Sequence, residues 1–263
     1  MKLTNYLILL TLLIFVNATF ASNEADKLTM SYQSISDVEN YIKNEQDSAL
    51  TEGKLLLWVV GGNWCHDSRS LATKLKHPEL APVISKHYRL SMIDVGYLNQ
   101  GFEFTNIANM STFYATPTVL IIDPETMSQT NAEDMFIWSN AYQVKQEVAQ
   151  EYFERYSLIK SSKNTSLLSE EQLRLKGILN SYITAQEKRI LAGYKVLGPM
   201  LKAYKEGETN PDFDPYWNAL FEVRYSLQKH IKENKQLIAE WEQSKAVELV
   251  FPDAKPLPWE TQE

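Results

Sequence analysis

Short apolar runs of strand length alternate with helical stretches over residues 34–158, and this alternation is the strongest constraint on the fold. The runs at 54–60, 88–95, 118–122 and 135–138 have the length and apolar character of buried strands. Strands separated by helices pair in parallel within a central sheet, whereas the last two, adjacent in sequence, suggest an antiparallel hairpin at one edge. The predicted fold class is α/β, with a central sheet flanked by helices.

A second part of the chain begins after the polar segment 161–166. No strand pattern follows that segment, so we expect an all-α C-terminal region at 167–248 after the sheet domain at 34–158. A tail at 249–263 contains three prolines and is expected to be extended.

Two helices account for the predicted all-α region. Residues 169–172 (SEEQ) match a helix-capping box, and the dipeptide Gly198-Pro199 is expected to kink or end the helix that follows. Residues 216–246 are predicted to form one long amphipathic helix. Four large aromatic residues of this helix are predicted as core positions: Trp217, Phe221, Tyr225 and Trp241.

Residues 1–21 have the parts of a secretory signal peptide. Lys2 gives a positive start, residues 6–16 form an apolar core, and residues 18–21 supply small side chains suited to cleavage. The apolar core is shorter than the roughly 20 residues that span a bilayer, and an uncleaved anchor is the alternative. We expect a periplasmic or secreted protein with no stable membrane insertion after cleavage.

Charge and histidine spacing restrict the partners. The formal net charge of −7 argues against nucleic acid, which binds basic faces. The four histidines are scattered without metal-ligand spacing, so no structural metal is expected. The sequence leaves the oligomeric state open.

Cys65 is the single cysteine of the chain. Exported domains commonly carry an even number of cysteines as disulfide pairs, but this chain can form no internal disulfide. The thiol is therefore either a buried small apolar group or available for chemistry with another molecule.

Two separated motifs resemble the thioredoxin superfamily. Residues 55–68 (LLLWVVGGNWCHDS) resemble its strand, turn and Trp-Cys-x-x-Cys helix start, and residues 115–118 (ATPT) resemble its cis-proline segment. The resemblance covers about residues 34–150 and implies a thioredoxin-like central sheet with Cys65 at the attacking position. Ser68 replaces the second cysteine, a Cys-x-x-Ser variant similar in that feature to monothiol glutaredoxins and anterior gradient proteins.

The residues beside Cys65 have candidate catalytic roles. At a helix N-terminus, unpaired amides and the helix dipole stabilise a thiolate. Ser68 lies three residues on, where its hydroxyl can donate to the sulfur. A protonated His66 would favour the thiolate, while Asp67 opposes this. The alternatives are a solvated His66 and a Ser68 that is only a polar residue of the first turn.

The resemblance also implies the substrate-binding residues. If the Thr116–Pro117 peptide is cis, Thr116 offers its backbone to an extended substrate. Trp64 is expected on the surface rim around the thiol. The alternative for Pro117 is an ordinary trans proline that opens an edge strand.

Together these features predict an exported monothiol protein that exchanges thiols and disulfides with client proteins. Release of the substrate needs an external thiol: one from the substrate gives isomerisation, and glutathione or a similar small thiol gives reduction. No cofactor is expected beyond glutathione in that role. The alternatives are a redox-silent binding or chaperone module that uses the Pro117 groove and the helical region, and a glutathione-using transferase.

Overall fold

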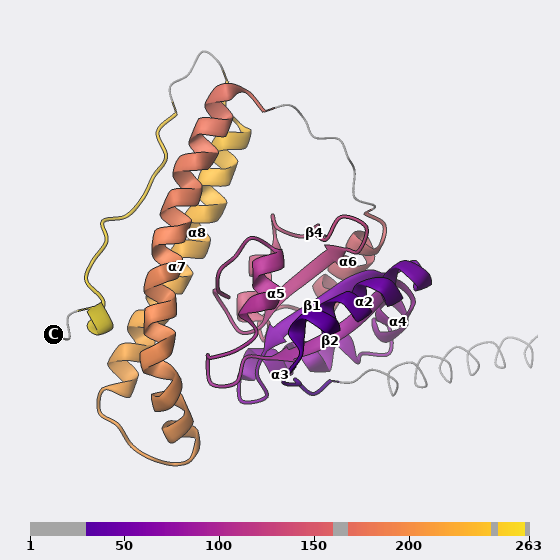
Figure 1. Cartoon of the computed structure of the whole chain (residues 1–263), viewed down its shortest axis with the longest axis horizontal. Coiled ribbons are helices and arrows are strands. Elements are labelled where there is room, and N and C mark those ends of the chain that lie inside the picture. Colours follow the sequence, from indigo (N-terminus) through magenta and orange to yellow (C-terminus); the bar gives the residue numbers. More distant parts are fainter. Residues whose placement is uncertain (1–29, 160–167, 243–246, 261–263) are drawn as a thin grey trace, which may run out of the picture.

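The computed structural model describes residues 30–159, 168–242 and 247–260 (Figure 1). The expected signal peptide at 1–21 lies outside these residues. Within them, no helix combines the length and apolar character needed to cross a membrane. The helices and strands, in chain order, are α2 (Val38–Glu52), β1 (Leu55–Gly61), α3 (His66–Leu75), α4 (Ala81–His87), β2 (Tyr88–Asp94), α5 (Phe102–Ile107), β3 (Thr118–Asp123), β4 (Ser128–Gln129), the 3-10 helix η1 (Met135–Asn140), α6 (Gln146–Ser157), α7 (Glu170–Lys205), α8 (Phe213–Ala239) and the 3-10 helix η2 (Pro258–Glu260).

Four strands form one sheet in the order β2-β1-β3-β4. β1 is parallel to β2, with Gly61 beside Asp94, and antiparallel to β3, with Val60 beside Thr118. β4 is antiparallel to β3. The predicted α/β class, the parallel pairing of the first two strands and an antiparallel edge are confirmed. The parallel pairing expected for the third strand is wrong: β3 is antiparallel to β1, because the chain enters β3 at the end of the sheet where β1 ends. The C-terminal ends of β1 and β2 and the start of β3 therefore lie at the same end of the sheet. Both sequence motifs are found there.

The position predicted for the edge strand was wrong. β4 covers Ser128–Gln129, while residues 135–138 belong to the helix η1. The buried Asn131 side chain bonds the free edge of β3 instead: Ile121 N donates to its Oδ1 at 3.0 Å, and its Nδ2 donates to Val119 O at 2.9 Å. Because these β3 backbone groups are satisfied by a side chain, Met135 and Trp138 of η1 are buried without forming a strand.

Side chains alternate along β1 and divide the core into two layers. Leu57 and Val59 pack with residues of α3, α4 and α6. Leu56, Trp58 and Val60 belong to a layer that includes residues of α2, α5, α7 and α8. Since α7 and α8 share this buried layer with the sheet, the helical region is packed on the sheet domain.

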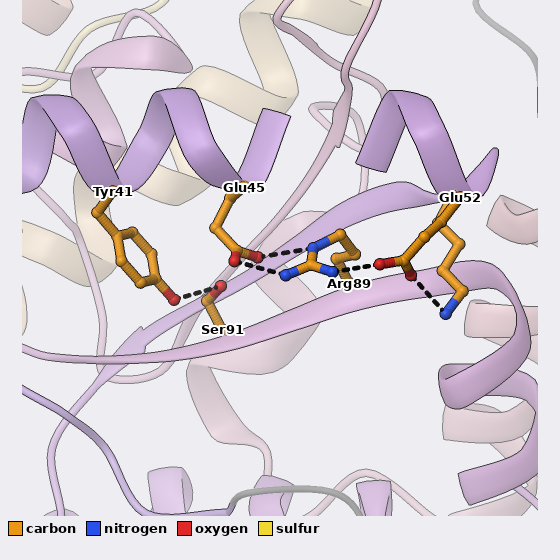
Figure 2. Close-up of polar contacts among 6 residues, drawn as sticks. Tyr41, Glu45, Glu52, Arg89 and Ser91 are labelled. Atoms are coloured by element: carbon orange, nitrogen blue, oxygen red, sulfur yellow. Dashed lines mark hydrogen bonds and ion pairs between the residues drawn. The ribbon is translucent and has the colours of Figure 1, made fainter. Parts of the chain in front are cut away.

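Arg89 of β2 connects α2 to the sheet (Figure 2). Its guanidinium donates to both carboxylate oxygens of Glu45, at 3.1 and 2.7 Å, and also pairs with Glu52. Pairing with Glu45 raises the pKa of Arg89. Beside it, the Tyr41 hydroxyl donates to Ser91 Oγ at 2.9 Å. Polar pairs therefore supplement the apolar contacts that hold α2 on the sheet.

The helices α7 and α8 lie side by side as a long hairpin (Figure 1). α7 begins with the predicted capping box, in which Ser169 and Gln172 bond each other's backbone N–H groups. α8 ends at Ala239, before the predicted limit. The chain after 247 returns along the hairpin, where Trp259 Nε1 of η2 donates to Arg189 O at 3.0 Å.

Gly198 and Pro199 do not end the helix, because α7 continues to Lys205. Leu197 and Leu201, on either side of the proline, are buried in the layer shared with the sheet. A Cβ atom on Gly198 would lie 2.4 Å from the Tyr97 carbonyl oxygen. The glycine therefore allows α7 to approach the loop after β2, and packing on both sides of Pro199 compensates for the hydrogen bond it cannot donate.

Glu187 of α7 anchors the hairpin on the segment that leads to Pro117. Its buried carboxylate accepts hydrogen bonds from Ser111 N at 3.1 Å, Ser111 Oγ at 2.7 Å and Tyr114 Oη at 2.5 Å. Burial and the Glu187 carboxylate raise the pKa of Tyr114, so its hydroxyl remains a donor. A buried carboxylate is destabilising unless donors bond it, and the buried donors are likewise destabilising without an acceptor.

Glu187→Ala is expected to destabilise the protein by about 2–4 kcal/mol, because it removes the acceptor of three hydrogen bonds at a buried position. Denaturant unfolding followed by tryptophan fluorescence measures the change. Glu222→Ala, at an exposed position of α8, is the control and is expected to change stability by less than about 0.5 kcal/mol. Equal unfolding midpoints for the two variants would rule out an anchoring role for Glu187.

Candidate functional site

Cys65 lies at the N-cap of α3, directly after the turn that follows β1. Its backbone N–H donates to Gly62 O at 3.0 Å, and its carbonyl accepts from Arg69 N at 3.1 Å, the first bond of the helix. The side chain is partly exposed. The strand, turn and helix start predicted from the motif therefore place the thiol at the sheet edge, where it can be reached from outside.

The turn before Cys65 is held by a segment that sequence reasoning missed. Tyr32 N donates to Asn63 Oδ1 at 3.1 Å, and Asn63 Nδ2 donates back to Tyr32 O at 3.0 Å. The Tyr32 hydroxyl donates to Ser68 O at 3.0 Å, and burial raises its pKa. Tyr32 and Asn63 are 31 residues apart, and no local pattern indicates such a pairing.

The Thr116–Pro117 peptide is cis, as the resemblance implied, and Thr116 faces the thiol. Cys65 Sγ donates to the Thr116 carbonyl at 3.0 Å, and Thr116 Oγ1 donates to Cys65 Sγ at 3.3 Å. The carbonyl bond requires the S–H form, whereas the hydroxyl can donate to thiol or thiolate. When the sulfur ionises it therefore loses one of these bonds and strengthens the other.

Ser68 does not make the hydrogen bond to sulfur that sequence reasoning assigned to it. The side chain is fully buried, and its Oγ accepts from Gly62 N at 3.3 Å. A Cβ atom on Gly61 would lie 2.6 Å from this oxygen, so glycine is needed there for the close approach. Among the described residues, the polar contacts of the sulfur come from Thr116 alone.

His66 and Asp67 point toward Tyr142 across the site. The His66 ring packs on the Tyr142 ring with centroids 4.4 Å apart, and Asp67 Oδ1 accepts from Tyr142 N at 2.8 Å. The first turn of α3 is thus tied to the loop before α6. His66 is exposed, and the hydrogen bonds of the sulfur are made with Thr116, which agrees with the alternative of a solvated neighbour.

Trp64 is partly buried and was expected on the surface rim. Its Nε1 donates to Gly96 O at 2.6 Å, and its ring meets the Trp217 ring edge-on with centroids 6.4 Å apart. The residue therefore lies between the thiol turn, the loop after β2 and α8. It connects the two parts of the chain at the site.

A cavity of about 370 Å³ lies beside Cys65, with one wall from the sheet domain and the other from α8. Gln228 of α8 holds this wall in place by donating to Tyr114 O at 3.0 Å. Its lining includes Cys65, Asp67 and Thr116 on the sheet side, and Trp217, Phe221, Arg224 and Tyr225 on the α8 side.

Two aromatic residues predicted as core line this cavity instead. Phe221 and Tyr225 are 52% and 58% exposed, and their rings stack with centroids 6.0 Å apart. They lie one helical turn apart on α8, and both line the cavity beside Cys65. Trp217 and Trp241 are partly buried against core clusters, in agreement with the prediction.

Within residues 30–159, 168–242 and 247–260, no three His, Cys, Asp or Glu side chains are grouped so as to hold a metal ion. The cavity brings together the Cys65 thiol, the carbonyl and hydroxyl of Thr116, the Asp67 carboxylate, the Arg224 guanidinium and a partly aromatic wall.

Comparison with known proteins finds a likeness to a solved structure. No protein-family model and no curated protein matches the chain. A solved structure, a disulphide isomerase from Xylella fastidiosa Temecula1, is similar with a TM-score of 0.42 and 21% sequence identity, covering 49% of this chain and 98% of that chain. About half of this chain has no counterpart in that structure.

Thr116→Val is expected to slow alkylation of Cys65 by iodoacetamide at neutral pH by about 2- to 10-fold, because it removes the donor that bonds the thiolate. The rate is measured by mass spectrometry of the quenched protein. Thr73→Val is the matched control, since Thr73 is exposed on α3 and its hydroxyl bonds Arg69 O. An unchanged rate in Thr116→Val would mean that the hydroxyl does not act on the thiolate.

Proposed function

We propose that this chain is an exported protein that exchanges thiols and disulfides through Cys65 alone. The observation that carries the proposal is the placement of Cys65 Sγ: partly exposed at the start of α3, beside a cavity, and 3.0 Å from the backbone carbonyl of Thr116. A helix N-terminus favours the thiolate, which is the attacking species. The segment at 1–21 supports export to the periplasm or beyond.

The exchange step is a displacement at sulfur. The Cys65 thiolate attacks one sulfur of a substrate disulfide, an S–S bond forms to Cys65, and the other substrate sulfur leaves as a thiolate with the bonding electron pair. The leaving thiolate takes a proton from water, to which the Cys65 thiol gave its own. Cys65 ends in a mixed disulfide, and no electrons are gained or lost overall.

Release needs a thiol from outside the chain. A second thiol attacks the substrate sulfur of the mixed disulfide and restores the Cys65 thiolate. A thiol of the same client gives a rearranged disulfide, which is isomerisation. For net reduction, a glutathione thiolate attacks the Cys65 sulfur instead and the client leaves with both of its sulfurs as thiols. A second glutathione then restores the Cys65 thiolate and leaves as oxidised glutathione. Ser68 cannot take this role, because it has a hydroxyl and is buried against Gly62.

A redox-silent binding module is the second candidate, and the exposed pair Phe221 and Tyr225 favours it. Exposed aromatics that line a cavity are typical of sites that hold a partner. In this alternative the bond from Cys65 Sγ to the Thr116 carbonyl keeps the thiol neutral and inert. Reactivity of the thiol separates the two candidates.

Mixed-disulfide trapping tests the proposal. The purified protein, incubated with a peptide disulfide and quenched in acid, is expected to carry one peptide at Cys65, and added reduced glutathione is expected to remove it. Cys65→Ser is the control and is expected to carry none. If Cys65 alkylates no faster than a free cysteine at neutral pH and traps no peptide, the exchange function is wrong and the binding module is preferred.

Ser68→Cys tests whether release depends on an external thiol. The new side chain lies three residues from Cys65 on the same helix, so it is expected to expel the bound peptide and leave a 65–68 disulfide without added glutathione. The measurement is the lifetime of the mixed disulfide by mass spectrometry. Ser70→Cys adds the same thiol to α3 on a different face and is expected to leave the complex intact. Equal lifetimes in both variants would contradict the assigned role of position 68.

A further inference from the structure

Arg224 of α8 is a buried cation in the wall of the Cys65 cavity. The residue is only 8% exposed. Among the described residues, no carboxylate lies within ion-pairing distance of its guanidinium. Arg89, Arg155, Arg174 and Arg189 each pair with at least one carboxylate, and Arg69, which pairs with none, is exposed to solvent. Arginine is almost never buried to this extent without a paired anion.

The contacts of Arg224 hold the guanidinium but leave most of its donors free. A guanidinium has five N–H donors. Among the described residues, its single hydrogen bond runs from Arg224 Nη1 to Tyr194 Oη at 3.5 Å, which is long for a hydrogen bond. The guanidinium carbon also lies 5.7 Å from the Trp217 ring centroid and 6.0 Å from that of Tyr194. These rings stabilise the cation and fix its place, but they accept no strong hydrogen bond.

The charges around the cavity give a ligand one favoured orientation. Asp67 is on the α3 side, near the thiol, where its carboxylate already accepts from Tyr142 N. Arg224 is on the α8 side. A negative group on a bound molecule is therefore repelled by the α3 wall and attracted by the α8 wall, which leaves the sulfur end of the molecule toward Cys65.

We infer that Arg224 binds a carboxylate of the molecule whose sulfur reacts with Cys65, so that the preferred substrates are carboxylate-bearing disulfides and thiols. The inference rests on the proposed exchange function and names its substrate class. A planar guanidinium with free donors matches a carboxylate in a bidentate pair, and partial burial strengthens the pair relative to one in water. The carbon chain between the carboxylate and the sulfur lies against Trp217, Phe221 and Tyr225.

The reaction is the same thiol–disulfide exchange, with the carboxylate of the substrate bound by Arg224 at the end away from the reacting sulfur. The Cys65 thiolate forms an S–S bond with the nearer sulfur, and the farther sulfur leaves as a thiolate that is protonated by water. Arg224 takes no part in bond making or breaking. It is a binding residue, and its effect is on which disulfides react.

Two small disulfides of similar size provide the test: 3,3′-dithiodipropionate, which carries carboxylates, and bis(2-hydroxyethyl) disulfide, which is neutral. Formation of the mixed disulfide at Cys65 is followed by mass spectrometry. Each rate is divided by the rate of the same probe with free 2-mercaptoethanol, which removes the intrinsic reactivity of the probe. The wild-type protein is expected to prefer the carboxylate probe by about tenfold or more, the effect of a charge-assisted hydrogen bond.

Arg224→Gln is expected to abolish this preference. Arg224→Lys is expected to keep part of it, because lysine retains the positive charge but cannot form the bidentate pair with a carboxylate. Lys232→Gln removes the same charge from an exposed position of α8 outside the cavity and is expected to retain the preference. The wild-type ratio stands as a test by itself if the Arg224 variants fail to fold. A wild-type ratio near one, or an unchanged ratio in Arg224→Gln, overturns the inference.

A different result marks failure of the proposed function. If Cys65 forms no mixed disulfide with either probe, the exchange function is wrong, and the inference falls with it. Where the carboxylate probe is preferred, oxidised glutathione and a pair of peptide disulfides with Glu or Gln beside the cysteine are compared to identify the source of the carboxylate. The substrate whose rate falls in Arg224→Gln is the preferred one, and a fall in none of them contradicts the inference.

Discussion

The segment from Ser111 to Pro117 is held by the helical hairpin at one end and faces the thiol at the other. At its start, Glu187 accepts three hydrogen bonds from Ser111 and Tyr114. At its end, the carbonyl and hydroxyl of Thr116 contact the sulfur. Backbone carbonyls between these points accept from Tyr194 and Gln228 of the hairpin. Docking of the hairpin and the geometry of the thiol site therefore depend on the same few buried contacts, and a buried carboxylate holds them together only while its donors remain in place.

The position of Ser68 shows what a serine contributes in this turn. Its hydroxyl oxygen accepts a hydrogen bond from Gly62 N and lies close to Gly61, the glycine that ends β1. The hydroxyl therefore stabilises the turn that presents Cys65. The sulfur is left with the contacts of Thr116, which lies on the same strand-leading segment as the cis proline. A thiolate loses the carbonyl bond and keeps the hydroxyl bond, so the Thr116 hydroxyl can bond the sulfur in either form.

Those features that follow from neighbouring residues could be predicted from the sequence. The strand, turn and helix start around Cys65 and the cis peptide before Thr118 are set by short motifs. The misplaced edge strand and the uninterrupted α7 have a different origin: the Asn131 side chain satisfies β3 from outside the strand, and packing on the sheet overrides the break expected at Pro199. Periodicity shows that a residue lies on the apolar stripe of a helix, but it does not show which structure that stripe meets.

The same limit applies to the α8 wall of the site. Phe221 and Tyr225 have the spacing of core residues, yet they face the cavity, because the face of α8 that meets the sheet is fixed by contacts such as Gln228 to Tyr114 O. Arg224 lies between these faces and contacts Tyr194, whose hydroxyl bonds Phe113 O in the segment that leads to Thr116. The proposed carboxylate-binding residue, Arg224, and the proposed reactive thiol of Cys65 thus belong to parts of the chain more than 150 residues apart in sequence. The contacts that dock the hairpin also hold the segment before Thr116, so a change in how the hairpin docks is expected to alter both the proposed choice of substrate and the surroundings of the sulfur.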